Sequence, residues 1–131
     1  MKLTELADEA YENVRAINHL TIGGASLPAP LVYEVTGSLK AAEYGLRQAL
    51  EQLAGGLLRS LDDHEVVEDD GADPWPRAQA AAAFLREAAE RAGAIGDLLE
   101  RAQLAINRQA YRPRVDVDEP QHADELEDLE G

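Results

Sequence analysis

Apolar side chains recur at the spacing of an amphipathic helix in three stretches of the chain. In the first stretch they fall on one arc when successive residues are placed 100° apart, which predicts a helix over residues 4–19. The residues on this arc are Leu3, Leu6, Ala7, Ala10, Val14 and Ile17. Residues 21–30 then interrupt the pattern, because their glycines and prolines disfavour a continuous helix.

The second stretch has the most regular apolar pattern and predicts a helix over residues 31–61. Its apolar residues, here called the leucine stripe, are Leu31, Val32, Val35, Leu39, Ala42, Leu46, Ala49, Leu50, Leu53, Leu57 and Leu61. This stripe is expected to face the core. Gly55 and Gly56 interrupt another side, and each costs about 1 kcal/mol relative to Ala in a helix interior. We expect the helix to continue through them, with a break there as the alternative.

The third stretch predicts a helix over residues 74–110, with Asp73 as its cap and Pro74 in its first turn. Its expected core residues are Ala78, Ala81, Ala82, Leu85, Ala88, Ala89, Ala92, Ile95, Leu99, Ala102 and Ile106. Oppositely charged residues four apart, Arg86 with Glu90 and Asp97 with Arg101, indicate that the other side is solvated. Glu87 and Arg91 repeat this spacing nearer the edge of that side.

Charge separates the helical stretches from the rest of the chain. The sequence has 26 acidic and 12 basic residues, a formal net charge of −14. Residues 61–76 hold seven acids and no base, and residues 115–131 hold eight acids and no base. Because such blocks bury little apolar surface, residues 112–131 are expected to form a disordered acidic tail.

The pattern predicts an all-α fold: an antiparallel helical bundle of three helices, one short and two long, with a disordered acidic C-terminal tail. A single bundle domain is expected over residues 1–111, followed by the tail over 112–131. Its core would be thin, because the third helix buries mostly Ala. Self-association, giving a homodimer, is therefore expected to supply the missing burial.

Composition excludes several kinds of chemistry. The absence of Cys removes thiol nucleophiles, disulfides and Cys-ligated metals. The excess of acid disfavours direct nucleic-acid binding, which begins with neutralised phosphates. No apolar stretch approaches the ~20 residues that a bilayer crossing needs, so no membrane contact and a cytoplasmic location are expected.

Catalytic and metal-binding patterns are weak. His19, His64 and His122 are isolated from one another, and the acids near His64 resemble a solvated loop more than a cation site. No Ser lies in a nucleophile-elbow context, and no Gly-rich loop has the residues of a phosphate cradle. We therefore expect no enzyme activity, no metal and no cofactor.

The segment from Arg59 to His64 resembles the Arg-x4–6-His motif of HEPN ribonuclease domains, which are all-helical and of similar length. The resemblance implies that Arg59 and His64 act on RNA phosphate and on the 2′-hydroxyl proton, across a dimer groove. Seven acids between Asp62 and Asp73 would repel RNA at this position. Ribonuclease activity is kept as an alternative.

In size, helix content and lack of Cys, the chain is also similar to the WXG100 family of secreted helical hairpins. Members have a Trp-x-Gly turn and a Tyr-x-x-x-Asp/Glu export signal. Here Trp75 is followed by Pro76 and Arg77, and no Tyr has an acid four residues later. The resemblance covers architecture alone, and a secreted hairpin is a further alternative.

Protein–protein contact is the function that the sequence favours. Small residues and tyrosines lie on the second helix away from the leucine stripe, and we call this set the tyrosine face: Tyr33, Gly37, Ala41, Tyr44 and Gly45. It is expected either to receive the first helix or to bind a partner. Leu126 and Leu129, set among acids, could fold on a partner's groove. The chain is thus predicted to be an adaptor, regulator or small structural subunit, with an acidic nucleic-acid mimic as an alternative.

Overall fold

The computed structural model describes residues 2–110, 112 and 114. These residues contain three α-helices and no strand: α1 (Leu3–Thr21), α2 (Ala29–Asp63) and α3 (Trp75–Ile106). The predicted all-α fold of one short and two long helices is confirmed. The predicted disordered tail lies almost entirely outside the described residues.

The described residues divide into two compact units: residues 2–31 with 110, 112 and 114, and residues 32–109. Each unit is described by itself. The expectation of a single domain over residues 1–111 stays a prediction.

Helix α1 ends at Thr21, shortly before Gly23. The Thr21 hydroxyl donates a hydrogen bond to the Ile17 carbonyl at 2.9 Å, and the Ile22 N–H donates to the Asn18 carbonyl at 3.0 Å. Ile22 is already extended, with φ of −69° and ψ of 149°, and Gly23 follows with φ of 96°, a value that favours glycine. No residue of α1 is buried.

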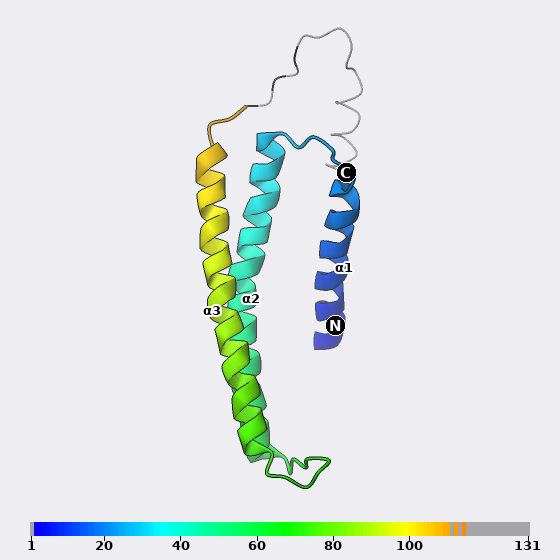
Figure 1. Ribbon diagram of the computed structural model, residues 1–131, viewed down its shortest axis with the longest axis vertical. Coiled ribbons are helices and arrows are strands. Elements are labelled where there is room, and N and C mark those ends of the chain that lie inside the picture. The colour runs from blue at the N-terminus through cyan, green and yellow to red at the C-terminus, as the bar shows by residue number, and fades with distance from the viewer. Residues whose placement is uncertain (1, 111, 113, 115–131) are drawn as a thin grey trace. The chain divides into compact units, whose positions relative to one another are not determined.

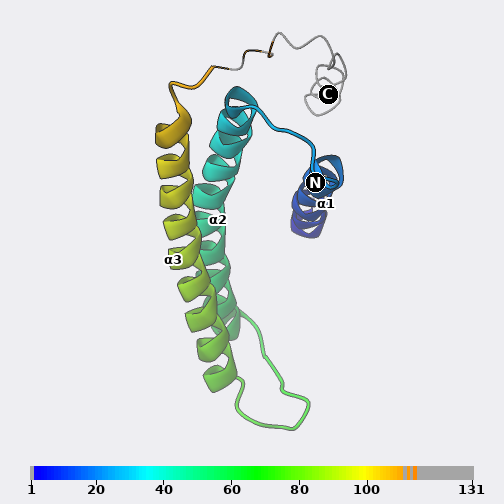
Figure 2. The same ribbon diagram turned by 45° about the horizontal axis from the view of Figure 1, so that its top comes forward.

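Helices α2 and α3 form an antiparallel hairpin, seen side by side in both Figure 1 and Figure 2. Helix α2 runs without a break through Gly55 and Gly56, so the predicted continuity is confirmed. The Arg59 side chain covers this point: a Cβ added to Gly55 would lie 3.1 Å from Arg59 Nη1. The polar side chain therefore packs over the small residues within the same helix.

Small residues line the contact between the two long helices, which we call the inner seam. Its buried members are Ala54 of α2 and Ala82, Ala89, Ala92, Gly93, Gly96 and Gln103 of α3. No large side chain among the described residues is fully buried. Because Ala and Gly have no side-chain atoms beyond Cβ, the backbones of α2 and α3 can approach closely.

The leucine stripe does not make the inner seam, so its predicted place in the core is wrong for much of its length. Leu46 is 44% exposed and Leu53 is 52% exposed, although Leu50 and Leu57 are half-buried. On α3 the predicted core stripe divides in the same way: Ala82, Ala89 and Ala92 are buried, whereas Ala81, Ala88, Ile95 and Ala102 are exposed. Helices α2 and α3 thus contact each other through the sides whose small residues allow close approach, and not through the sides with the largest apolar area.

The loop between the long helices is fixed by its acids. Arg77 at the start of α3 donates hydrogen bonds to Glu68 Oε2 at 3.1 Å and to Asp70 Oδ2 at 2.9 Å. The N–H of Ala72 and Arg77 together hold the pKa of Asp70 below its usual value. Helix α3 begins one residue later than expected, so the residue before it is Pro74 and not the predicted cap Asp73. Asp73 Oδ1 still accepts a hydrogen bond from the Trp75 N–H at 3.1 Å. Part of this acidic segment is thus held in place by local contacts.

Candidate interaction surfaces

Tyr44 of the tyrosine face contacts α3. Its hydroxyl donates a hydrogen bond to Asp97 Oδ1 at 2.6 Å. Its ring lies against Gly96, where an added Cβ would be 2.7 Å from Tyr44 Cε1. Only glycine at position 96 leaves room for this ring.

Hydrogen bonding to Asp97 also changes the titration of Tyr44. The hydrogen bond favours the neutral phenol, and partial desolvation and the negative charges of Asp97 and Glu100 act in the same direction. Together they raise the pKa of Tyr44 to about 12. The contact between the helices is therefore intact at neutral pH.

Tyr33 and Gly37 meet Gln103 of α3. The Gln103 side chain is 7% exposed, and its Nε2 donates a hydrogen bond to the Tyr33 carbonyl at 2.9 Å. A Cβ added to Gly37 would lie 2.8 Å from the same Nε2. The absence of a side chain at Gly37 thus admits the amide of Gln103.

The rest of the tyrosine face is open. Ala41 is exposed, and a Cβ added to Gly45 would meet no atom within 4 Å. The structure therefore brings Tyr33, Gly37 and Tyr44 together against α3 and leaves Ala41 and Gly45 outside this contact. Their predicted role in binding a partner stays a prediction, and Leu126 and Leu129 lie outside the described residues.

The contacts across the inner seam set the heptad register of the hairpin. Gly37 and Tyr44, seven residues apart on α2, and Gly96 and Gln103, seven apart on α3, occupy equivalent a positions. With this register, the large apolar residues Leu39, Leu46, Leu53, Phe84 and Leu98 fall at c positions, and Ala81, Ala88, Ile95 and Ala102 fall at g positions. Val35, Ala42 and Ala49 fall at f, opposite the seam, and Leu104 falls at b. In an antiparallel pair the c and g positions of both helices lie on the same side of the hairpin, so the residues at c and g share one side.

We call this side the apolar face. It consists of Leu39, Leu46 and Leu53 of α2 and of Ala81, Phe84, Ala88, Ile95, Leu98 and Ala102 of α3. Phe84 is 71% exposed and Leu98 is 60% exposed. The sequence analysis missed Phe84 and Leu98, although their spacing from Ala88 and Ile95 repeats a heptad pattern and could have indicated them.

Charges on the apolar face are fewer on α2 than on α3. At the c and g positions between residues 35 and 57, Glu43 is the only ionisable residue of α2. On α3, Arg77 and Arg91 lie at c positions, and Arg91 donates a hydrogen bond to Glu87 at 2.8 Å, the pair that the sequence predicts. Exposed apolar surface of this extent typically marks an interaction site.

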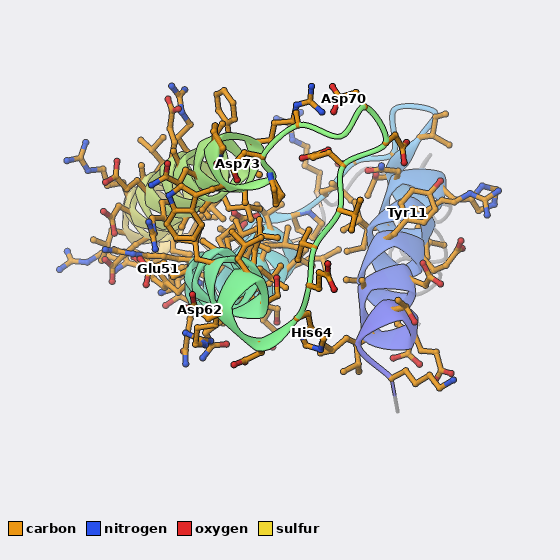
Figure 3. All side chains as sticks on the ribbon, turned by 90° about the horizontal axis from the view of Figure 1, so that it is seen from below. Tyr11, Glu51, Asp62, His64, Asp70 and Asp73 are labelled. Carbon is orange, nitrogen blue, oxygen red and sulfur yellow. The ribbon has the colours of Figure 1, made fainter. Side chains whose placement is uncertain are left out.

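Arg59 and His64 do not form a buried polar site. Figure 3, viewed from the end of the hairpin that carries the loop, shows His64 beside the end of α2 and Asp70 farther along the loop. Both His64 and Arg59 are exposed. No buried side-chain nitrogen or oxygen of the described residues lacks a hydrogen-bond partner.

In residues 2–110, 112 and 114, no three His, Asp or Glu side chains converge to hold a metal ion. Within the same part of the chain, no helix combines the length and the apolar character that crossing a bilayer requires.

Comparisons with protein-family models, with curated proteins and with solved structures find no match to this chain.

Proposed function

We propose that this protein is a non-enzymatic helical interaction protein, an adaptor, regulator or small structural subunit, that self-associates through the apolar face of its α2–α3 hairpin. We expect it to act in the cytoplasm. The observation that carries the proposal is the apolar face itself, with Leu46 and Leu53 of α2 and Phe84 and Leu98 of α3 exposed on one side.

Burial of this face in a dimer is energetically favourable. Each fully buried Leu or Phe side chain stabilises by roughly 1.5–3 kcal/mol relative to its exposed state. The inner seam, built of Ala, Gly and one Gln, provides little of this burial within the chain. Two hairpins that meet through their apolar faces form a four-helix bundle with a leucine-rich core.

Charge does not oppose the contact. Residues 32–61 hold three acids and three bases, and residues 75–109 hold four acids and five bases. The helices of two copies are thus close to neutral where they would meet. The acids that dominate the net charge lie elsewhere in the sequence.

The test is the solution mass of the full chain, measured by light scattering, for the wild type and the double variant Leu46→Glu/Leu53→Glu. We expect a dimer for the wild type and a monomer for the variant, because two buried carboxylates per subunit would oppose association. Circular dichroism should show unchanged helix content, since both side chains are exposed in the single chain.

The matched control is Gln48→Glu/Gln52→Glu, which makes the same change of charge on the same helix, away from the apolar face. This variant should remain a dimer. A monomeric wild type would overturn the proposal, and so would a Leu46→Glu/Leu53→Glu variant that keeps the dimer mass.

A further inference from the structure

One acidic side chain lies among the leucines of α2 that form the apolar face. Of the acidic residues that the structure describes, only Glu43 and Glu68 are half-buried, and the others are exposed. Glu68 accepts a hydrogen bond from Arg77 at 3.1 Å. No ion pair of the described residues includes Glu43. Glu43 therefore combines partial burial with a carboxylate that no basic side chain in this part of the chain holds.

Apolar residues surround Glu43 on the side of the hairpin that carries the apolar face. Glu43 occupies a g position of α2. Leu39 lies four residues before it and Leu46 three residues after it, the spacings that place side chains next to each other on a helix. The contact of Tyr44 with α3 makes Ile95 the nearest g position of that helix. A second copy that covers this face would also cover Glu43.

The charged groups nearest to Glu43 lie outside the c and g positions of this face. On α2, Lys40 and Arg47 are three residues before it and four residues after it, both at d positions toward the inner seam. Arg47 pairs with Glu51 at 3.5 Å. The charged residues of α3 at the same level of the hairpin, at positions b, e and f, are Asp97, Glu100 and Arg101.

The two arginines of α3 at c positions are held by acids of their own chain. Arg77 donates hydrogen bonds to Glu68 and Asp70 at 3.1 and 2.9 Å, and Arg91 donates to Glu87 at 2.8 Å. Either arginine would have to leave these acids to pair with a carboxylate of a second copy. The apolar face of a second copy thus offers mainly apolar side chains to the carboxylate.

We propose that Glu43 makes self-association through the apolar face dependent on pH, so that two copies bind each other more strongly as the pH falls; this inference rests on the proposed function. The helices are close to neutral in net charge, but covering a single carboxylate has a cost of its own. Side chains of the second copy replace water around it, and burial disfavours the charged form of a carboxyl group. In a two-fold symmetric dimer this cost arises twice.

Protonation of Glu43 removes the charge and with it most of this cost. The dimer therefore binds more protons than two separate chains do. A lower pH favours the species that binds more protons, which sets the direction of the effect.

The experiment measures the dissociation constant of the full-length dimer by sedimentation equilibrium near pH 7.5 and near pH 5.0, at constant ionic strength. The variant is Glu43→Gln, which removes the charge and keeps the side-chain shape and the helix propensity. The matched control is Glu34→Gln, the same change at an exposed e position of the same helix. This control reports the general effect of a less negative chain, since a net charge of −14 by itself opposes association.

Near pH 7.5, Glu43→Gln should lower the dissociation constant at least about tenfold relative to Glu34→Gln. Between the two pH values the wild-type constant should fall about two- to fivefold more than that of Glu43→Gln, and Glu34→Gln should follow the wild type.

Two results would overturn this inference and leave the proposed self-association in place. One is equal dissociation constants for Glu43→Gln and Glu34→Gln. The other is a weaker dimer for Glu43→Gln, which an ion pair of Glu43 with an arginine of the second copy would cause. Monomers of all three proteins at both pH values would overturn the proposed self-association as well.

Discussion

The inner seam and the apolar face are two sides of the same hairpin, and they differ in the size of their largest side chains. Ala89 and Gly96 bring α3 close to α2, and the polar groups of Tyr44 and Gln103 complete the contact. The apolar face instead carries large apolar side chains, and Leu46 and Leu53 of α2 and Phe84 and Leu98 of α3 remain exposed within the chain. The exposed leucines thus mark apolar surface that a further contact could bury, whereas the small residues mark the surface through which α2 and α3 already contact each other.

The largest expected effect on stability comes from placing a larger side chain in the inner seam. Ala89 is 0% exposed, whereas its neighbour Ala88 lies on the apolar face. Ala89→Leu should lower the free energy of unfolding by about 1–3 kcal/mol, because the larger side chain forces the helices apart. Ala88→Leu should change it by less than about 0.5 kcal/mol at protein concentrations low enough for the chain to be monomeric, because Ala88 is exposed there. Urea unfolding followed by circular dichroism, at matched protein concentrations, measures both.

Equal destabilisation by the two Ala variants would mean that the hairpin buries both sides. The contrast between the inner seam and the apolar face would then be lost.

Alanine substitutions at two glycines should change the free energy of unfolding in opposite directions. Gly45→Ala should raise the free energy of unfolding by about 1 kcal/mol, because alanine favours the helix and meets no atom there. Gly96→Ala should lower it by about 1 kcal/mol or more, since its Cβ would displace the Tyr44 ring. Thermal unfolding of both variants beside the wild type gives the sign directly. An increase in stability for Gly96→Ala would show that the ring moves away at no cost.

The smallest effect concerns pH. The pKa of Tyr44 is raised to about 12, so the folded chain keeps this proton where the unfolded chain, with the ordinary value of 10.0, has lost it. The stability from the Tyr44–Asp97 contact is therefore fully present below pH 10 and is lost as the pH rises through about 12. Phenolate absorbance should show one transition near pH 12 that is missing in Tyr44→Phe and shifts to lower pH in Asp97→Asn. An unchanged transition in Asp97→Asn would exclude Asp97 as the main cause.

Helix positions follow from the sequence because they depend on local spacing. Proline and glycine mark where α1 ends and where α3 begins, and the observed ends differ from the predicted ones by one to four residues. Continuity through Gly55 and Gly56 was also predictable, because the cost of two glycines is small against a helix of 35 residues.

Which sides of α2 and α3 contact each other could not be predicted from apolar content alone. The leucine stripe has the strongest pattern, yet burial of Ala82, Ala89 and Ala92 depends on how closely two backbones approach. The contacts of Tyr44 with Asp97 and of Gln103 with Tyr33 join residues 53 and 70 apart, respectively, and spacing within one helix does not reveal such pairs. The heptad recurrence of small residues on α3 is the signal that points to the inner seam.

The hydrogen bond from Gln103 to the Tyr33 carbonyl has a consequence for the order of folding. It joins residues 70 apart in sequence, whereas Arg77 and Glu68 at the loop are nine apart. Because the entropy lost on closing a chain segment grows with its length, contacts beside the loop form at the lowest cost, and each one shortens the segment that the next must close. We therefore expect the contacts between α2 and α3 to form in order from the loop toward the open end. The hydrogen bond of the Gln103 amide should be the last to form on folding and the first to break on unfolding.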